Sequence, residues 1–167
     1  MKKLCFLLCC VLALQLFSGC TKKNENFQVP VNFYYSTKEI TYNTPDSVIQ
    51  AETREGAGYA DDVEAFIQAY LQGPVSSDLQ RIMPSDVYLV SCEVEGDTVC
   101  IVLSTQISKL SGISLLTACS ALFLSLQDFS GTQTLQISAD ETLLDDKDML
   151  TITADDIVLV DAVNVSE

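Results

Sequence analysis

The side chains of this 167-residue chain that could carry chemistry are carboxylates and a few cysteines, because the chain has no histidine. Without histidine, Ser-His and Cys-His dyads and typical catalytic zinc sites are excluded. Two carboxylates are enough for glycoside hydrolysis, with Asp61, Asp62, Glu64, Glu93 and Asp128 as candidates. Such pairs arise by chance among 23 acidic residues, and no tryptophan is present to stack on a sugar. We therefore predict no catalytic residue, no cofactor and no enzyme activity, with hydrolysis as a minor alternative.

Two acidic clusters near the end of the chain offer oxygen atoms for calcium, DDKD at residues 145–148 and DD at residues 155–156. Neither matches an EF-hand loop, which needs a central glycine and a terminal glutamate. We therefore expect solvated acidic loops and predict no metal site, with calcium binding left open.

The first twenty residues, MKKLCFLLCCVLALQLFSGC, have the order of a secretory signal. Two lysines precede an apolar run at residues 4–17, and small residues follow it. The segment FSGC at residues 17–20 resembles the lipobox of bacterial lipoproteins, in which the cysteine thiol is diacylated and becomes the new N-terminus. The alternative is an ordinary signal cut at small residues, with an incidental cysteine.

Lipidation at Cys20 predicts three parts of the chain: a lipoprotein signal peptide at residues 1–19, a lipidated tether at 20–28, and a single domain at 29–167. Two acyl chains, such as palmitate, anchor a protein stably where one chain is marginal. We therefore expect an extracytoplasmic protein that is attached to the outer leaflet of the cell membrane.

Loss of the signal peptide removes two lysines, so the net charge changes from −14 to −16. Such an acidic surface repels nucleic acid and anionic lipid headgroups. We predict no nucleic-acid partner, and we expect membrane contact through the lipid anchor alone.

Three cysteines remain after cleavage, Cys92, Cys100 and Cys119. A two-residue turn at 96–97 would place Cys92 and Cys100 on opposite faces of a hairpin, whereas a three-residue turn would place them on one face. We predict buried free thiols, with a disulfide between Cys92 and Cys100 as the alternative.

A helix is predicted between Asp61 and Gly73. Asp61 is placed to cap it, and Glu64 lies three residues later, as in a capping box. Gly73 suits the left-handed C-terminal position, and Pro74 prevents continuation. Its apolar face, at helical spacing, comprises Val63, Phe66, Ile67, Tyr70 and Leu71. The break at Gly73-Pro74 is thus explained as a helix stop, without a catalytic role.

The other elements follow from period and composition. Strands are predicted at residues 29–35, 48–54, 87–94, 98–103, 132–138 and 157–163, a turn at 43–46, and a second helix at 113–126. In the first strand Val31, Phe33 and Tyr35 share one face. The hairpin strands 87–94 and 98–103 are almost continuously apolar, so we expect both faces to be covered. The helix at 113–126 carries no charge, so it either forms the core or presents a docking face. The predicted fold class is α+β: two main helices packed on a mixed, mostly antiparallel sheet, in the order β-β-α-β-β-α-β.

The order of these motifs resembles the GerMN domain, a domain of sporulation and spore germination. It runs from VNFYY through a weak second strand, a helix that ends LQGP, the hairpin VEGDTVCIVLS and a long helix to LQISADE. The residues that carry the resemblance are Leu71, Gly73, Pro74, Pro84, Gly96, Leu103 and Ser104. The chain differs from the family at Val102, where Asp or Asn is usual, and at Glu141, near which a glycine is common.

The resemblance implies an envelope lipoprotein without enzyme activity. In spore formers, a tandem-domain relative supports a secretion-like complex between mother cell and forespore, and its domains are similar to ring-building folds. We therefore expect a protein-interaction or assembly module whose partners are envelope proteins, with a role in sporulation or germination suggested by the resemblance. The alternative is an envelope protein that binds a small ligand or glycan in a concave pocket.

Overall fold

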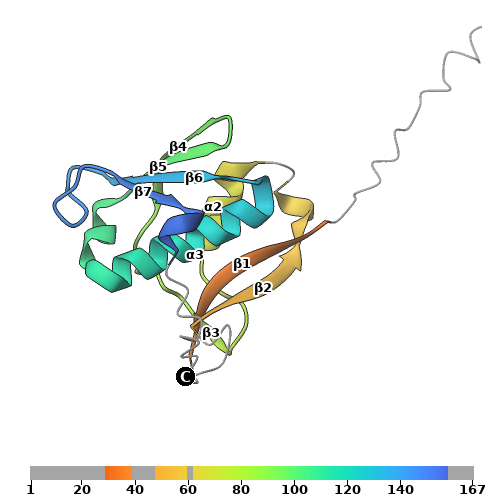
Figure 1. Ribbon diagram of the computed structural model, residues 1–167. Coiled ribbons are helices and arrows are strands. Elements are labelled where there is room, and N and C mark those ends of the chain that lie inside the picture. Colours follow the sequence, from red (N-terminus) through yellow and green to blue (C-terminus); the bar gives the residue numbers. More distant parts are fainter. Residues whose placement is uncertain (1–28, 39–47, 60–61, 158–167) are drawn as a thin grey trace, which may run out of the picture.

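The computed structural model describes residues 29–38, 48–59 and 62–157 (Figure 1). Its elements, in chain order, are β1 (Pro30–Thr37), β2 (Ile49–Glu55), the 3-10 helix η1 (Gly56–Gly58), α2 (Val63–Leu71), β3 (Leu79–Gln80), β4 (Leu89–Glu95), β5 (Thr98–Leu103), the 3-10 helix η2 (Thr105–Lys109), α3 (Gly112–Ser130), β6 (Thr134–Ala139), β7 (Leu150–Thr153) and the 3-10 helix η3 (Ala154–Asp156). Two main helices and a mixed set of strands confirm the predicted α+β class.

The strands form two sheets, where the sequence suggested one. In the first sheet β1 lies between β2 and the short β3, and both pairings are antiparallel. The second sheet has the order β4-β5-β6-β7, in which β5 and β6 are parallel and the outer pairings are antiparallel. The two-residue β3 and the short β7 add to the predicted order, and they are too short to show a clear period in the sequence.

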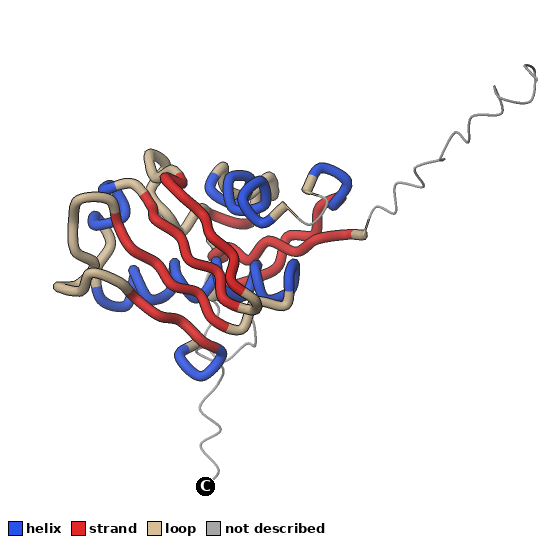
Figure 2. The backbone as a smooth tube through the Cα atoms, turned by 90° about the horizontal axis from the view of Figure 1, so that it is seen from above, coloured by secondary structure: helices blue, strands red, loops and turns tan. Residues whose placement is uncertain are grey.

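Helix α3 connects the parallel strands β5 and β6 and forms the centre of the domain (Figures 1 and 2). Its buried residues include Leu115, Cys119, Phe123 and Leu126, and it contacts both sheets. By length and apolar composition this helix would also suit a membrane, but half of it is buried inside the domain. Of the two alternatives, the structure therefore shows the core helix.

The alternating face of β1 is confirmed. Val31, Phe33 and Tyr35 are buried, and the ring of Phe33 stacks on that of Phe66 from α2, with 4.5 Å between centroids. On α2 the predicted apolar face is also confirmed, because four of its residues are buried and Val63 packs against the core from a partly buried position.

The N-terminus of α2 differs from the prediction by one residue. The capping side chain is that of Asp62, which accepts a hydrogen bond from the backbone N–H of Ala65 at 3.0 Å. Asp61 lies outside the described residues, and the predicted capping box is wrong because Glu64 is one position too early. Glu64 instead accepts a hydrogen bond from Gln68, one turn later, at 3.1 Å. Adjacent aspartates give the same sequence signal, so only the backbone geometry distinguishes them.

Of the two turns considered, the hairpin has the two-residue turn, since Glu95 pairs with Thr98 and Gly96 has a φ of 64°. Its predicted burial on both faces is wrong. One face of β5 is buried against the core and the other is half-buried, while most of β4 is exposed. β4 is an edge strand, and its valines therefore lie beside solvent in spite of the apolar sequence.

Several predictions fall on residues that the structure does not describe: the lipidation site Cys20 with the signal and tether, the turn at 43–46, and all but the first residue of the strand at 157–163. They remain predictions.

Candidate functional site

The end of α2 is fixed by glycine geometry. The helix ends at Leu71, Gln72 is still right-handed, and Gly73 has a φ of 88°. This is the left-handed conformation that the sequence predicted for Gly73, and Pro74 follows it. Residues 70–76, which we call the α2 joint, then turn away from the helix and lead toward β3.

Two arginines hold the carbonyl groups of the α2 joint. Arg81 donates hydrogen bonds to the carbonyls of Leu71, at 2.6 Å, and of Gln72. Arg54 on β2 donates to the carbonyl of Gly73 at 2.8 Å. The last carbonyls of a helix have no partner within the helix, and cations are favourable there. The joint is therefore closed by side chains from β2 and from the segment after β3.

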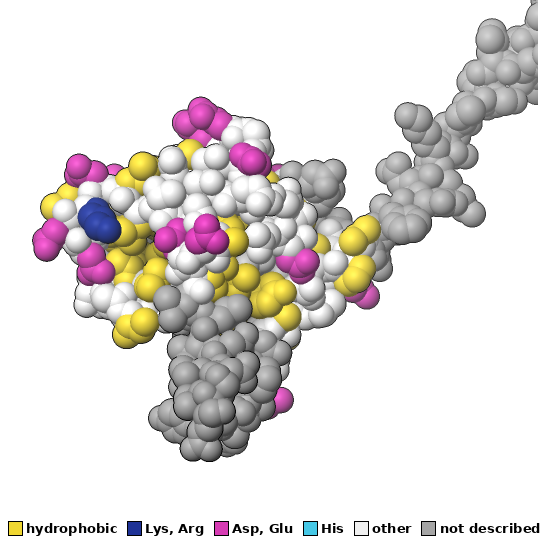
Figure 3. Space-filling model, in the orientation of Figure 1, with side chains coloured by type: hydrophobic (Ala, Val, Ile, Leu, Met, Phe, Trp, Pro, Cys, Tyr) yellow, Lys and Arg dark blue, Asp and Glu magenta, His cyan; other side chains and the backbone are white. Residues whose placement is uncertain are grey.

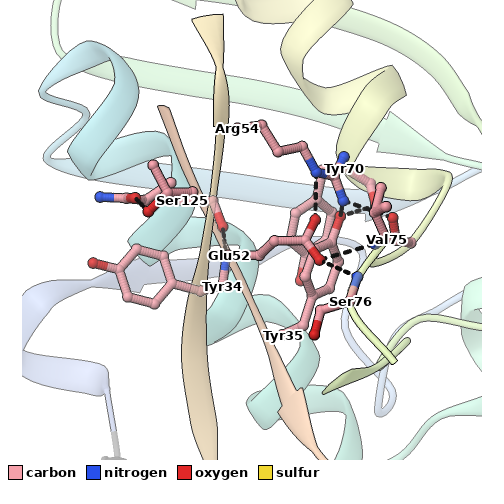
Figure 4. Close-up of polar contacts among 11 residues, drawn as sticks. Tyr34, Tyr35, Glu52, Arg54, Tyr70, Val75, Ser76 and Ser125 are labelled. Atoms are coloured by element: carbon pink, nitrogen blue, oxygen red, sulfur yellow. Dashed lines mark hydrogen bonds and ion pairs between the residues drawn. The ribbon is translucent and has the colours of Figure 1, made fainter. Parts of the chain in front are cut away.

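Glu52 holds the other side of the α2 joint (Figure 4). Its Oε2 accepts hydrogen bonds from the backbone N–H groups of Val75 and Ser76 at 2.9 and 2.7 Å, and its Oε1 forms an ion pair with Arg54. Burial opposes ionisation, but these hydrogen bonds and the arginine charge outweigh it and lower the pKa of Glu52. Glu52 and Arg54 are two residues apart, so both lie on the face of β2 that adjoins the core.

Tyr35 links the α2 joint to the core. Its hydroxyl donates to the carbonyl of Tyr70 at 2.9 Å, and the two rings stack with 5.0 Å between centroids. The guanidinium of Arg54 lies 4.3 Å from the centroid of Phe33, in a cation–π arrangement. Burial raises the pKa of Tyr35 to about 12, although Arg54 acts to lower it. Tyr35 is therefore a neutral donor, and the arrangement provides no acid or base for reactions near neutral pH.

A groove of about 480 Å³ lies beside the α2 joint, between the end of α2 and the start of β4. Its lining residues are Gln68, Leu71, Gln72, Arg81, Ser85, Val87, Tyr88 and Leu89. Tyr88 is 59% exposed. Arg81 forms no ion pair with any described carboxylate, although the chain as a whole is strongly acidic. The groove thus offers an aromatic surface, two amides and a cation to a ligand.

The predicted motif residues shape the walls of this groove. Leu71 lines it, and Pro84 begins a turn in which its carbonyl accepts from the N–H of Val87 at 3.1 Å. The buried Ser104 fixes Tyr88 twice: its Oγ accepts from the Tyr88 N–H at 3.1 Å, and its own N–H donates to the Tyr88 carbonyl at 2.9 Å. Leu103 is fully buried before it. Gly96 lies apart, in the hairpin turn.

Four of the five candidate carboxylates, all but Asp61, lie within the described residues, and these four have separate local roles. Asp62 caps α2, Glu64 bonds to Gln68, Asp128 accepts from the amide of Asn32 at 2.6 Å, and Glu93 is exposed on β4. None of them lines the groove. The described residues thus assign them structural or solvent-exposed positions.

In each acidic cluster one aspartate accepts a hydrogen bond from a backbone N–H group. Asp145 accepts from the N–H of Gly112 at 2.8 Å, and Asp156 accepts from the N–H and the hydroxyl of Thr153. Asp145 and Asp146 have φ values of 48° and 65°, as in a type I′ turn, between the paired residues Leu144 and Lys147. Within the described residues no group of three or more metal-ligating side chains comes together.

The three cysteines are free, as predicted, and Cys92 and Cys100 lie on opposite faces of the hairpin because of its register. Cys119 is fully buried, whereas the other two are half-buried. Burial, followed by the acidic neighbours Glu64 and Asp62, raises the pKa of Cys92 to about 11. Burial also raises the pKa of Cys119 to about 12. Both thiols are protonated at neutral pH and are weak nucleophiles.

Sequence reasoning missed Glu52, Arg54, Arg81 and Tyr88. A sequence signal existed for the first two, because the run ETR places two opposite charges on one face of a predicted strand. For Arg81 and Tyr88 no local pattern exists, since their partners are brought to them by the fold.

Comparisons with known proteins agree on the domain. A model of the family Germane, described as sporulation and spore germination, matches residues 32–145. No curated protein matches the chain.

Among solved structures, the tandem GerMN domains of the sporulation protein GerM from Bacillus subtilis are 19% identical, with a TM-score of 0.52 over 74% of this chain and 44% of that chain. The first GerMN domain of the same protein is 16% identical, with a TM-score of 0.50 over 70% and 86%. A predicted lipoprotein from Clostridium perfringens is 19% identical, with a TM-score of 0.48 over 77% and 89%. At these identities the two GerM structures show a common fold.

Proposed function

The chain belongs to the Germane family of sporulation and spore germination, and from this membership we propose that it is a lipid-anchored envelope protein whose domain binds another envelope protein. In this proposal the domain carries out no reaction. It holds a partner at the outer leaflet of the cell membrane, in a process related to sporulation or germination.

The observation that carries the proposal is the use of the family motif. Leu71, Gly73, Pro84 and Ser104 are all engaged in fixing the walls of one open groove, and none presents a reactive group. The carboxylates of Asp62 and Asp145 are engaged by backbone N–H groups, and burial keeps the thiols of Cys92 and Cys119 protonated at neutral pH. A groove with fixed walls, an exposed tyrosine and an arginine that has no acidic partner among the described residues suits binding, since tyrosine and arginine are enriched where proteins bind one another.

The location rests on Cys20 and the segment before it. We expect Cys20→Ser to leave an uncleaved or soluble form and to move the protein out of the lipid-anchored fraction. Fractionation followed by metabolic labelling with a clickable palmitate analogue measures both effects. A serine variant that fractionates and labels like the parent chain would overturn the anchor.

A small ligand is the second candidate occupant, because a volume of about 480 Å³ lies in the range of small-molecule sites, roughly 300–1,000 Å³. A ligand that binds only the folded state raises thermal stability by mass action. Thermal shifts with calcium, muropeptides and glycans therefore test this candidate. A shift that is abolished by Tyr88→Ala and retained in Asp155→Ala would favour it over a protein partner.

Photo-crosslinking in cells tests the protein partner directly. The crosslinker is placed at Tyr88, in the groove, and at the exposed Asp155, in η3, as a matched control position. We expect one recurrent envelope protein at Tyr88 and its absence at Asp155. Equal capture at both positions, or peptidoglycan alone at Tyr88, would contradict the proposal.

A further inference from the structure

β4 has an open edge. It lies at the end of the four-stranded sheet and pairs with β5 alone among the described strands. Its hairpin turn is closed by the pair of Glu95 with Thr98. Bonded and non-bonded pairs alternate along an antiparallel ladder, so Glu93 and Glu95 bond to β5, whereas Cys92 and Val94 direct their N–H and C=O groups away from it. These outward groups can pair with another strand.

The side chains along this edge are apolar and acidic. Tyr88, Val90 and Val94 are 59%, 45% and 53% exposed, and they are three of the eight large apolar side chains that are exposed in the described residues. Glu93 and Glu95 are also exposed, on the opposite face of β4 from Val94. Figure 3 shows acidic side chains at the top of the molecule, where Figure 1 places the tip of the hairpin.

Proteins usually protect an exposed edge with lysine, proline, a bulge or an inward charge. β4 has no lysine and no proline, and its one irregularity lies between Leu89 and Ser91. α2 contacts β4, but no second strand among the described residues pairs with the regular segment 91–95. Its glutamates disfavour a second copy of this acidic chain, and they favour a partner strand with basic side chains at alternate positions.

The groove adjoins the edge of β4 at the start of the strand. Tyr88 and Leu89 line the groove at the point where β4 begins, so a strand laid along residues 91–95 can reach the groove at its end. The exposed ring of Tyr88 would then cover the apolar part of a lysine or arginine side chain.

We propose that the open edge of β4 binds an extended segment of the partner protein that carries lysine or arginine at every second position, and that this segment joins the sheet as a fifth strand beside residues 91–95. Main-chain hydrogen bonds to Cys92 and Val94 provide affinity, while Glu93 and Glu95 select basic side chains. This inference rests on the proposed function and names the chemistry of its partner.

Amide exchange measured by NMR tests the inference on the full chain in detergent micelles. Three amidated peptides are compared: KVKVKVK, the acidic EVEVEVE, and KVKPKVK, which has the same charge but a central proline that disrupts strand pairing. We expect KVKVKVK to slow exchange at Cys92 and Val94 by about tenfold or more, because both N–H groups become hydrogen-bonded. We expect no such protection from the other two peptides.

Charge-reversal variants distinguish peptide binding at the edge of β4 from a general attraction to the negative net charge of the chain. The double variant E93K/E95K should weaken binding of KVKVKVK by about tenfold, since two favourable cross-strand pairs become repulsive. The matched control D148K/D155K changes the net charge equally at exposed positions away from β4 and should leave the affinity unchanged within about threefold.

Three outcomes would overturn the inference: no protection of Cys92 and Val94, equal protection by KVKPKVK, or equal weakening in both double variants. Crosslinking distinguishes this failure from a failure of the proposed function. A partner that is still captured at Tyr88 in the E93K/E95K variant with unchanged yield would leave the interaction module intact and remove the role of the edge. Absence of any partner at Tyr88 would instead contradict the proposed function itself.

Discussion

The α2 joint and the start of β4 border the same groove, but backbone groups of the joint are paired, whereas, among the described residues, those along the open edge of β4 are not. At the joint, Tyr35, Arg54 and Arg81 take up the carbonyls of four consecutive residues, 70–73, and Glu52 takes up two N–H groups. At the edge, the N–H and C=O groups of Cys92 and Val94 have no strand beside them within the described residues.

The difference indicates that the α2 joint contributes to stability, whereas the open edge of β4 is available for binding. The paired carbonyls of residues 70–73 hold the joint in place, and removal of one side chain leaves its buried partner without a hydrogen bond, at a cost in stability. An exposed edge contributes little to stability, so its side chains are free to vary with the partner. Substitutions on the two sides should therefore have very different effects on the free energy of unfolding.

The largest effect is expected from Arg54→Ala. It leaves the Glu52 carboxylate and the Gly73 carbonyl without their partner and removes the cation from the Phe33 ring. We expect the free energy of unfolding in urea to fall by about 3 kcal/mol. Lys109→Ala is the control, because its ion pair with Asp86 is exposed to solvent and contributes little to stability. Similar losses in the two variants would mean that the joint is no more important than a surface pair.

Gly73→Val should come next. A side chain at Gly73 requires a φ of 88°, and its Cβ would lie 2.9 Å from Arg81 Nε. We expect a loss of about 2 kcal/mol from backbone strain and from displacement of Arg81. At Gly58 an added Cβ meets no atom within 4 Å, so Gly58→Val should change stability by less than about 0.5 kcal/mol. Thermal unfolding of both variants provides the measurement, and a neutral Gly73→Val would exclude the strained helix stop.

The pH dependence of the joint gives the third prediction. The pKa of Glu52 is lowered by folding from an ordinary value of 4.5, so its contribution is fully present above that value and is lost as the pH falls through the lower folded value. Glu52→Gln should cost about 1.5 kcal/mol at neutral pH. The difference from the parent chain should shrink in acid, as measured by urea unfolding at a series of pH values. A difference that is constant with pH would show that the charge of Glu52 is not involved.

The smallest effect is expected at the edge itself. Val94 and Val99 are cross-strand partners on one face of the hairpin, but Val94 is 53% exposed and Val99 only 1%. Val99→Thr buries a hydroxyl and should cost about 1.5 kcal/mol, whereas Val94→Thr should cost less than about 0.5 kcal/mol. Chemical denaturation of this matched pair measures how open β4 is. Equal costs would mean that something covers the edge in solution.

Local patterns in the sequence predicted much of the fold. The alternation of Val31, Phe33 and Tyr35 identified the buried face of β1, and Gly73-Pro74 identified the end of α2. These features depend on neighbours within a few residues, so period and backbone preference are sufficient for them.

The polar contacts of the joint could not be predicted in this way. Arg54 and Gly73 are 19 residues apart, and Tyr35 and Tyr70 are 35 apart, so only the packed fold brings them together. The exposure of β4 was also missed, because an apolar strand at a sheet edge has the same sequence pattern as one in the middle. The pairing partners, which the sequence does not specify, decide between the two.

The parallel pairing of β5 with β6 has a consequence for folding. Each residue of β5 pairs with a residue of β6 that is 36 positions later, and α3 lies between the two strands in the sequence. The hairpin of β4 and β5 is local and can close within microseconds, but β6 is joined only after α3 has crossed the sheet. Until then the uncharged, apolar face of α3 has only part of its covering, and an incompletely folded chain that exposes this face is prone to aggregate. The rate at which β6 docks therefore sets how long the folding chain is exposed to aggregation.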